Sequence, residues 1–231
     1  MKKKITLHSE LIYILSILIL SFSVAMVSAA DFGLSMIVSP AYILSQKLGF
    51  LTFGQSEYVI QAILFIVFCV LIKKVKLIYF TSFATCLIYG AVLDLWRAVI
   101  PMFNPTVTIP GSMSMPIRIT FFVVGTLLAA IAIAMCFRTY IYPQVYDFFV
   151  KGISEYFKVD RTKFKIAFDM TFLALSCVMT LVFFRRFVGI GAGTIITTLV
   201  NGFLIGNFGK LLDSFVEIKP LFPHLAEKFD I

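Results

Sequence analysis

Long apolar runs, separated by short charged or proline-rich stretches, dominate the chain. A helix needs about 17–25 residues to cross the ~30 Å hydrocarbon core of a bilayer, and a shorter run can reach that length by tilting or by including flanking polar residues. Six runs meet this condition. The predicted spans are residues 11–30, 58–72, 77–93, 119–137, 166–184 and 187–209. The pattern therefore predicts an all-α, polytopic membrane helix bundle.

Two further apolar stretches do not have the form of ordinary spans. Residues 32–46 are uncharged but short and contain Pro40, whereas residues 140–157 begin near Pro143 and carry three charged side chains. Each fits a re-entrant hairpin, a broken helix or an amphipathic helix on the surface. Residues 99–116 contain four prolines. Because proline cannot sit in a continuous helix interior, this segment is predicted to be the central loop.

The composition excludes the main soluble classes. The 231 residues are 60% hydrophobic and 14% charged, with a mean hydropathy of +1.00, whereas a soluble domain is about 45–50% apolar and about 25% charged. A water-soluble enzyme, a disordered chain and a secreted disulfide scaffold are excluded, since none could keep so much apolar surface from water. The expected surroundings are membrane lipid.

The formal charge of +8 is read as a topology signal, because most basic residues flank apolar runs. With a cytoplasmic N-terminus and the two short stretches not crossing, 15 Lys and Arg residues fall on the cytoplasmic side and 5 outside. This predicts a plasma-membrane protein with both termini in the cytoplasm. Nucleic-acid binding is not expected, because no basic patch contains interleaved aromatics.

The N-terminal segment and the four cysteines each allow more than one interpretation. Lys2–Lys4 and the small residues near position 28 resemble a signal peptide, but the 20-residue run at 11–30 is long enough to span, and we expect a retained first helix. The four cysteines all lie in apolar runs and form no CxxC pair. Buried thiols are expected there, with no metal and no cofactor.

The two halves of the chain resemble each other in the order of their features. Residues 1–116 and residues 117–231 each contain a long clean helix, an interrupted stretch (32–50 and 139–158), and two further spans. Three spans per half would place the second copy upside down. Inverted repeats with broken segments at matching places are typical of secondary transporters, whose substrate site lies between the halves. The alternative is that any two apolar helical hairpins look alike.

The sequence also resembles a known group of proteins. The first helix, the Asp-Phe-Gly junction at 31–33, the Phe-Gly-Gln-Ser turn at 53–56 and the glycine-rich run at 189–194 leading to Asn201-Gly202 are similar to the bacterial YczE/YyaS/YitT membrane proteins. The resemblance covers most of the chain. It implies a small multi-pass membrane protein and says little about a substrate.

The glycine-rich run is the first candidate site. Gly191, Gly193 and Thr194 lie at the start of the last predicted span, and open backbone N–H groups at a helix N-terminus suit a carboxylate or phosphate. Arg185 and Arg186 just upstream would recruit such an anion. The alternative is close helix packing, since small residues let membrane helices touch.

Four polar residues within or next to the spans complete the candidates. Asp94 and Asp169 would serve as a proton or cation relay, or as counter-ions to a cationic solute. The alternatives are pairing of Asp94 with Arg97 at the membrane rim, and of Asp169 with nearby basic residues. Gln61 and Asn201 would contact a solute or hold helices together.

The preferred function is a small-solute permease, with the small-molecule substrate bound between the halves. The alternative is a non-transporting membrane subunit or regulator that assembles with a partner protein. A lipid-modifying enzyme is least favoured, because the sequence offers no nucleophile elbow or paired carboxylates at a defined spacing. We therefore expect no catalytic residues and no metal site.

Overall fold

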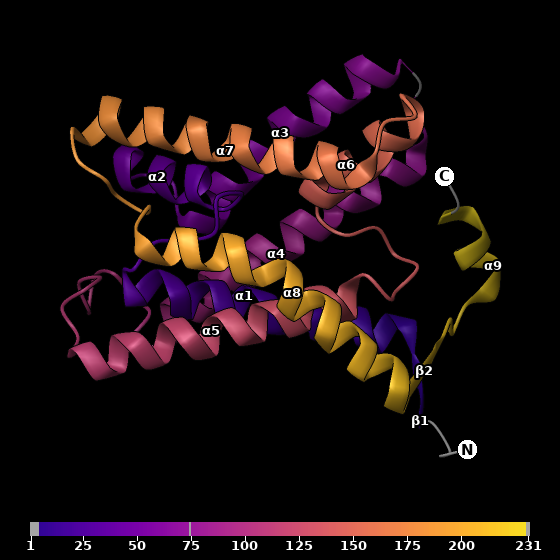
Figure 1. The fold of residues 1–231 in the computed structure, drawn as a ribbon, viewed down its shortest axis with the longest axis horizontal. Coiled ribbons are helices and arrows are strands. Elements are labelled where there is room, and N and C mark those ends of the chain that lie inside the picture. Colours follow the sequence, from indigo (N-terminus) through magenta and orange to yellow (C-terminus); the bar gives the residue numbers. More distant parts are fainter. Residues whose placement is uncertain (1–4, 74, 230–231) are drawn as a thin grey trace.

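A computed structural model describes residues 5–73 and 75–229. Within them, six helices are long and apolar enough to cross a membrane, as Figure 1 shows in ribbon form. They are α1 (Ser9–Ala30), α3 (Phe53–Ile72), α4 (Phe80–Val99, preceded by the 3₁₀ turn Leu77–Tyr79), α5 (Met115–Cys136), α7 (Arg161–Phe184) and α8 (Ala192–Phe215). The prediction of an all-α bundle of about six spans is confirmed.

The two interrupted stretches form short helices, α2 (Ser39–Leu48) and α6 (Val145–Tyr156). Their 10 and 12 residues rise only about 15–18 Å at 1.5 Å per residue, which is too short for the hydrocarbon core. Pro40 lies in the first turn of α2, where a missing N–H costs nothing, and Pro143 lies just before α6. Neither proline therefore interrupts a helix: Pro40 lies in the first turn of α2 and Pro143 lies outside α6.

The sixth span differs from the sequence prediction. The predicted span 187–209 lies too early, because Gly189 has a left-handed φ of 72° and the helix begins only at Ala192. It continues past Lys210 to Phe215, and Arg138 forms a bidentate ion pair with Asp213 in this last part, at 2.5 and 2.6 Å.

The segment that follows α8 contains a short strand and a short helix. After α8 the chain forms strand β2 (Val216–Lys219), which pairs in parallel with β1 (Ile5–His8). The short helix α9 (Pro223–Ala226) and the 3₁₀ turn Glu227–Phe229 follow. The β1–β2 pair brings the two ends of the described chain to the same side of the bundle.

Helices α1 and α5 form an antiparallel pair at the centre of one layer. Arg118, in the first turn of α5, donates from Nε to the carbonyl oxygen of Ala30 at 2.8 Å. At the opposite end, the Tyr140 N–H donates to Ser9 Oγ at 3.3 Å. Gly125 allows α5 to contact the backbone of α1 at Ser23. Helix α4 packs beside α1, and α8 packs beside α5.

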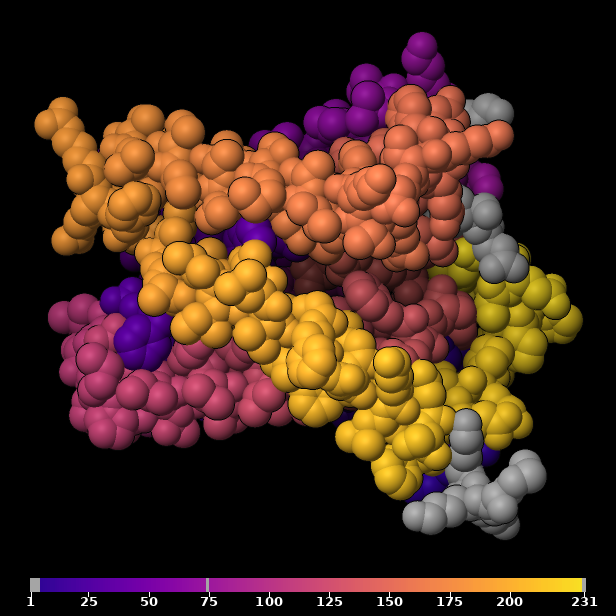
Figure 2. Space-filling view, in the orientation of Figure 1, coloured from indigo at the N-terminus to yellow at the C-terminus, as the bar shows by residue number. Residues whose placement is uncertain are grey.

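The second layer contains α2, α3, α6 and α7, with α2 and α6 each packed against both α3 and α7. Its interior is an aromatic cluster of side chains from α3, α6 and α7, including Phe68, Phe148 and Phe168. The layers join where α3 crosses α4, with Gly54 against Gly90. In contrast, α7 and α8 diverge, and Figure 2 shows the surface hollowed between them.

Candidate functional site

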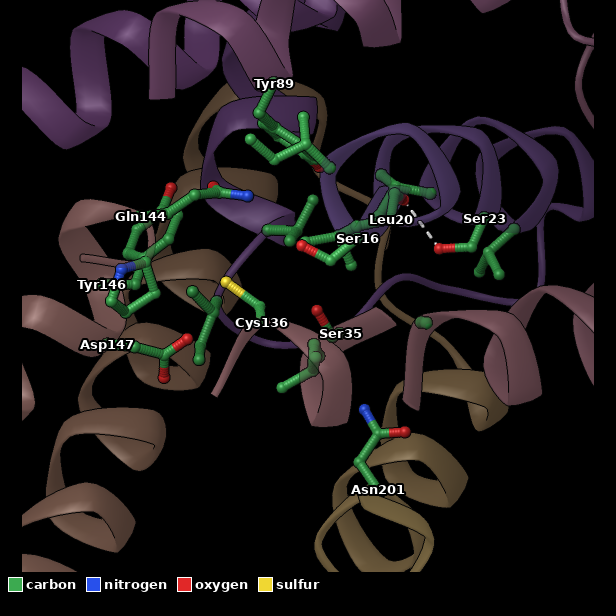
Figure 3. A pocket seen from close by; sticks show the side chains of 18 of the residues that line it. Ser16, Leu20, Ser23, Ser35, Tyr89, Cys136, Gln144, Tyr146, Asp147 and Asn201 are labelled. Carbon is green, nitrogen blue, oxygen red and sulfur yellow. Dashed lines mark hydrogen bonds between the residues drawn. The ribbon is translucent and has the colours of Figure 1, made fainter. Parts of the chain in front are cut away.

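A cavity of about 130 Å³ lies where the two layers and the two halves of the chain meet. Its walls come from α1, α4, α5 and α8, from the start of α6, and from the segment that precedes α2. Figure 3 shows the lining side chains. Most of the wall is apolar. The polar residues on which the argument depends are Ser35, Thr126, Gln144, Asp147, Thr197 and Asn201.

The start of α6 is fixed to the middle of α3. The Val145 N–H donates to Gln61 Oε1 at 3.1 Å, and Gln61 Nε2 donates to Gln144 Oε1 at 2.9 Å. Since Gln61 lies in the middle of the spanning helix α3, these bonds hold the N-terminal end of α6 deep inside the bundle. Gln144 is thereby placed in the cavity wall.

The segment before α2 is fixed in a comparable way. The Leu34 N–H donates to the carbonyl oxygen of Gly189 at 3.0 Å, and Ser39 Oγ donates to the Ser35 carbonyl at 2.9 Å. This segment therefore forms part of the cavity wall beside the turn that leads into α8, and it contributes Ser35 to that wall.

Two polar atoms from cavity-lining residues have no protein partner. Thr126 Oγ1 on α5 and Asn201 Oδ1 on α8 are buried and make no hydrogen bond, although both residues line the cavity. Figure 3 shows the Asn201 amide directed toward the other lining residues. Buried polar atoms normally have a partner, and an orphan costs about 1–3 kcal/mol. Thr126 and Asn201 therefore carry unused hydrogen-bonding capacity in the cavity wall, although the two atoms themselves are shielded from the cavity in this structure.

A buried polar network lies directly behind the cavity wall. Glu57 Oε2 accepts hydrogen bonds from the Tyr146 hydroxyl at 2.8 Å and from Gln61 Nε2 at 3.1 Å. The Tyr146 hydroxyl is the donor in its bond to Glu57. Tyr146 and Gln144 both line the cavity, so the network reaches it through two side chains.

Sequence reasoning missed Glu57, because the second span was centred on residues 58–72 and left this carboxyl outside. A signal for the true start was present. Thr52 accepts from the Gln55 N–H, and the Gln55 side chain accepts from the Thr52 N–H, which together form a capping box. The spacing of Thr and Gln marks a helix start at residue 53 and places Glu57 inside the helix.

The comparisons with known proteins show the family and nothing finer. A family model described as "Family of unknown function (DUF6198)" matches residues 7–210. The chain belongs to this family. The match to DUF6198 covers α1 to α7 and most of α8, and hence the cavity and the network behind it. Comparison with curated proteins and with solved structures gave no match.

The acidic candidates of this DUF6198 chain have different surroundings. Asp169 lies 3.3 Å from Lys165 Nζ, which lies at the same distance from Asp147, so the cavity-lining Asp147 belongs to a cluster of two carboxylates and one lysine. Asp94 is remote from the cavity: it accepts from Thr52 Oγ1 at 2.5 Å and from the Gly54 N–H at 2.9 Å. It therefore caps the start of α3.

The glycine-rich run of the DUF6198 chain makes internal contacts. The Gly191 N–H donates to Thr194 Oγ1 at 3.2 Å, and the Gly193 N–H donates to the Phe32 carbonyl at 2.8 Å. A Cβ atom at Gly193 would meet the ring of Phe122. These contacts favour the packing interpretation, since both amides already have partners inside the protein.

The structure thus does not gather the seven predicted substrate-binding residues around one cavity. Asn201 lines it, Gln61 lies one hydrogen bond behind it, and Asp169 connects to it through Lys165 and Asp147. Asp94 and the glycine-rich run lie elsewhere. Among residues 5–73 and 75–229, no group of three His, Cys, Asp or Glu side chains is placed to hold a metal ion.

Proposed function

We propose that this protein is a small-solute permease whose binding site is the cavity between the two halves. The observation that carries the proposal is the pair of unpartnered atoms, Thr126 Oγ1 and Asn201 Oδ1, in residues that face one cavity from two different spans. A mostly apolar pocket with a few convergent polar groups is the usual form of a small-molecule site.

The cavity limits the class of solute. Its volume of about 130 Å³ accommodates a molecule of a few heavy atoms, and side chains such as Leu20, Val24 and Ile133 supply apolar walls. The one carboxylate in the wall, Asp147, is already paired with Lys165. These features support an uncharged solute that has an apolar body and one or two hydrogen-bonding groups.

An inverted repeat is part of this proposal. Its support is the correspondence of packing partners: α1 packs on α4 as α5 packs on α8, and α2 and α6 each contact both α3 and α7. The antiparallel pairing of α1 with α5 has the direction that an inversion requires. A site between inverted halves, next to broken segments, is the arrangement of many secondary transporters. A YczE/YyaS/YitT-like relationship is proposed on the sequence motifs at 31–33, 53–56 and 189–194.

We place the protein in a bacterial plasma membrane with both termini in the cytoplasm. The β1–β2 pair puts both ends of the described chain on one side, which agrees with an even number of spans. With the six long helices crossing, that side receives 15 of the 20 Lys and Arg residues. Basic residues accumulate on the cytoplasmic side of membrane proteins.

The test is solute counterflow in proteoliposomes, with a panel of small uncharged radiolabelled metabolites. We expect uptake of at least one solute by the wild type and loss of that uptake in Asn201→Leu. The matched control is Asn207→Leu, which makes the same change on an exposed part of α8 and should transport normally. Absence of uptake across the panel, or equal loss in both variants, would overturn the proposal.

A second candidate, a non-transporting subunit that assembles with a partner protein, is favoured by the exposure of α8. Only 11% of the most apolar 18-residue stretch of α8 is buried inside the bundle. No atom of the described chain lies within 4 Å of the point where a Cβ on Gly202 or Gly206 would stand. Small residues four apart let a second helix approach closely. A stable partner that co-purifies through α8, together with no counterflow, would favour this candidate over the permease.

A further inference from the structure

Glu57 is a fully buried carboxyl group inside a membrane-spanning helix. Its exposed fraction is 0%. Oε2 accepts two hydrogen bonds, from Tyr146 and Gln61, whereas Oε1 is buried and makes none. Glu57 takes part in none of the ion pairs found within the described part of the chain. The two oxygens of this carboxyl therefore have very different surroundings.

The groups around Glu57 are neutral. The titratable side chains that face it are Cys86 and Tyr89 from α4 and Tyr146 from α6, each of them a thiol or a phenol. An ionised carboxylate without a cation in an apolar interior costs several kcal/mol, whereas a neutral carboxylic acid costs much less. The surroundings therefore favour the protonated, neutral form of this carboxyl group.

The same carboxyl is connected to the cavity by two short routes. One runs from Glu57 Oε2 to Tyr146, whose side chain lines the cavity. The other runs through Gln61 Nε2, which bonds both Glu57 Oε2 at 3.1 Å and Gln144 Oε1 at 2.9 Å. Figure 3 shows Gln144 and Tyr146 together at one end of the lining. A movement of Tyr146 therefore changes a hydrogen bond to Glu57, and a movement of Gln144 changes one through Gln61.

We propose that Glu57 is a proton-binding site that exchanges its proton with the cavity. A hydronium ion in the cavity gives a proton to the Tyr146 hydroxyl while that hydroxyl passes its own proton to Glu57 Oε2, which leaves a water molecule and a neutral carboxylic acid; the reverse steps return the proton to cavity water. Ionisable groups inside membrane bundles commonly form such proton relays. The extension to coupling, in which a solute at Gln144 alters proton binding at Glu57, rests on the proposed permease function.

The test is infrared difference spectroscopy of the full chain in lipid, which requires no solute. We expect a carbonyl band of a protonated carboxylic acid in the wild type, a shift of that band when ¹³C-labelled glutamate is incorporated, and its loss in Glu57→Gln. The isotope assigns the band to a glutamate even if the variant fails to fold. The matched control is Asp94→Asn, which removes a carboxyl at the end of α4 and should keep the band.

Exchange with the cavity is tested by transfer into D₂O. The band should shift in the wild type, and Tyr146→Phe, which removes the hydroxyl between the cavity and Glu57, should slow that shift. Absence of a protonated-glutamate band overturns the proton site, and a band that never shifts in D₂O overturns exchange with the cavity. Both results are independent of counterflow, so a failed transport assay leaves this inference standing and contradicts only the permease.

Discussion

Replacing Gln61 by leucine removes the side chain that holds the start of α6 against the middle of α3. Three hydrogen bonds are lost: from Gln61 Nε2 to Glu57 and to Gln144, and from the Val145 N–H to Gln61 Oε1. Leucine has a similar volume but offers no donor or acceptor. The substitution therefore tests the polar network with little change in packing.

The expected cost follows from these bonds. Hydrogen bonds within membrane bundles contribute about 0.6 kcal/mol each on average, so three contribute about 2 kcal/mol. The Val145 N–H is left without a partner, which adds about 1–3 kcal/mol. A free-energy loss of about 3–5 kcal/mol corresponds to a fall in Tm of about 6–20 °C for a chain of this size.

The assay is thermal unfolding in detergent, followed with a dye that becomes fluorescent on reaction with thiols. Cys86 and Cys136 are buried in the folded protein and become reactive when the bundle opens. Asn207→Leu, an exposed polar-to-leucine change on α8, serves as the control and should melt with the wild type. If Gln61→Leu also melts with the wild type, the network does not hold α6 in place and the reasoning is refuted.

Two further predictions use other contacts. Gly54→Ala places a Cβ against the Gly90 carbonyl oxygen and should destabilise the protein by about 1–3 kcal/mol. The control Gly206→Ala adds a Cβ in open space and should be neutral or slightly stabilising, because Ala favours helix by about 1 kcal/mol relative to Gly. Equal Tm values for the two variants would show that α3 and α4 do not approach so closely. Glu10 accepts from the Leu221 N–H at 2.9 Å, so Glu10→Ala should release the C-terminal segment and speed its cleavage by chymotrypsin while the long helices remain intact; an unchanged cleavage rate would contradict this role.

Much of the fold was predictable because hydrophobic length decides which segments can cross a bilayer. Residues 11–30 were predicted as the first span and form α1 (Ser9–Ala30). The proline-containing stretch 99–116 separates α4 from α5, as predicted. Helix ends were predicted less well. The capping box at Thr52 starts α3 before the predicted span, and α8 continues beyond residue 209, where Arg138, which follows α5, pairs with Asp213, 75 positions away in the chain.

The candidate site was predictable only in part. Asn201 and Gln61 were identified as polar residues within spans, and the structure places one in the cavity wall and the other directly behind it. Glu57 was missed because its position inside a helix depends on the helix start. Asp94 was chosen for its charge, but it caps α3, which requires knowledge of a contact between residues 40 positions apart.

The amino-acid sequence alone established a multi-span helical membrane protein, because burial of apolar side chains in lipid depends on run length and composition and not on which helix lies next to which. Tertiary contacts decided where the short helices start, which polar atoms remain without partners, and that Gln144, Asn201 and the surroundings of Glu57 meet at one cavity. Such a site forms from residues that are far apart in the chain. Its hydrogen bonds require donor and acceptor atoms to be positioned to within a few tenths of an ångström, and no pattern along the sequence encodes that positioning.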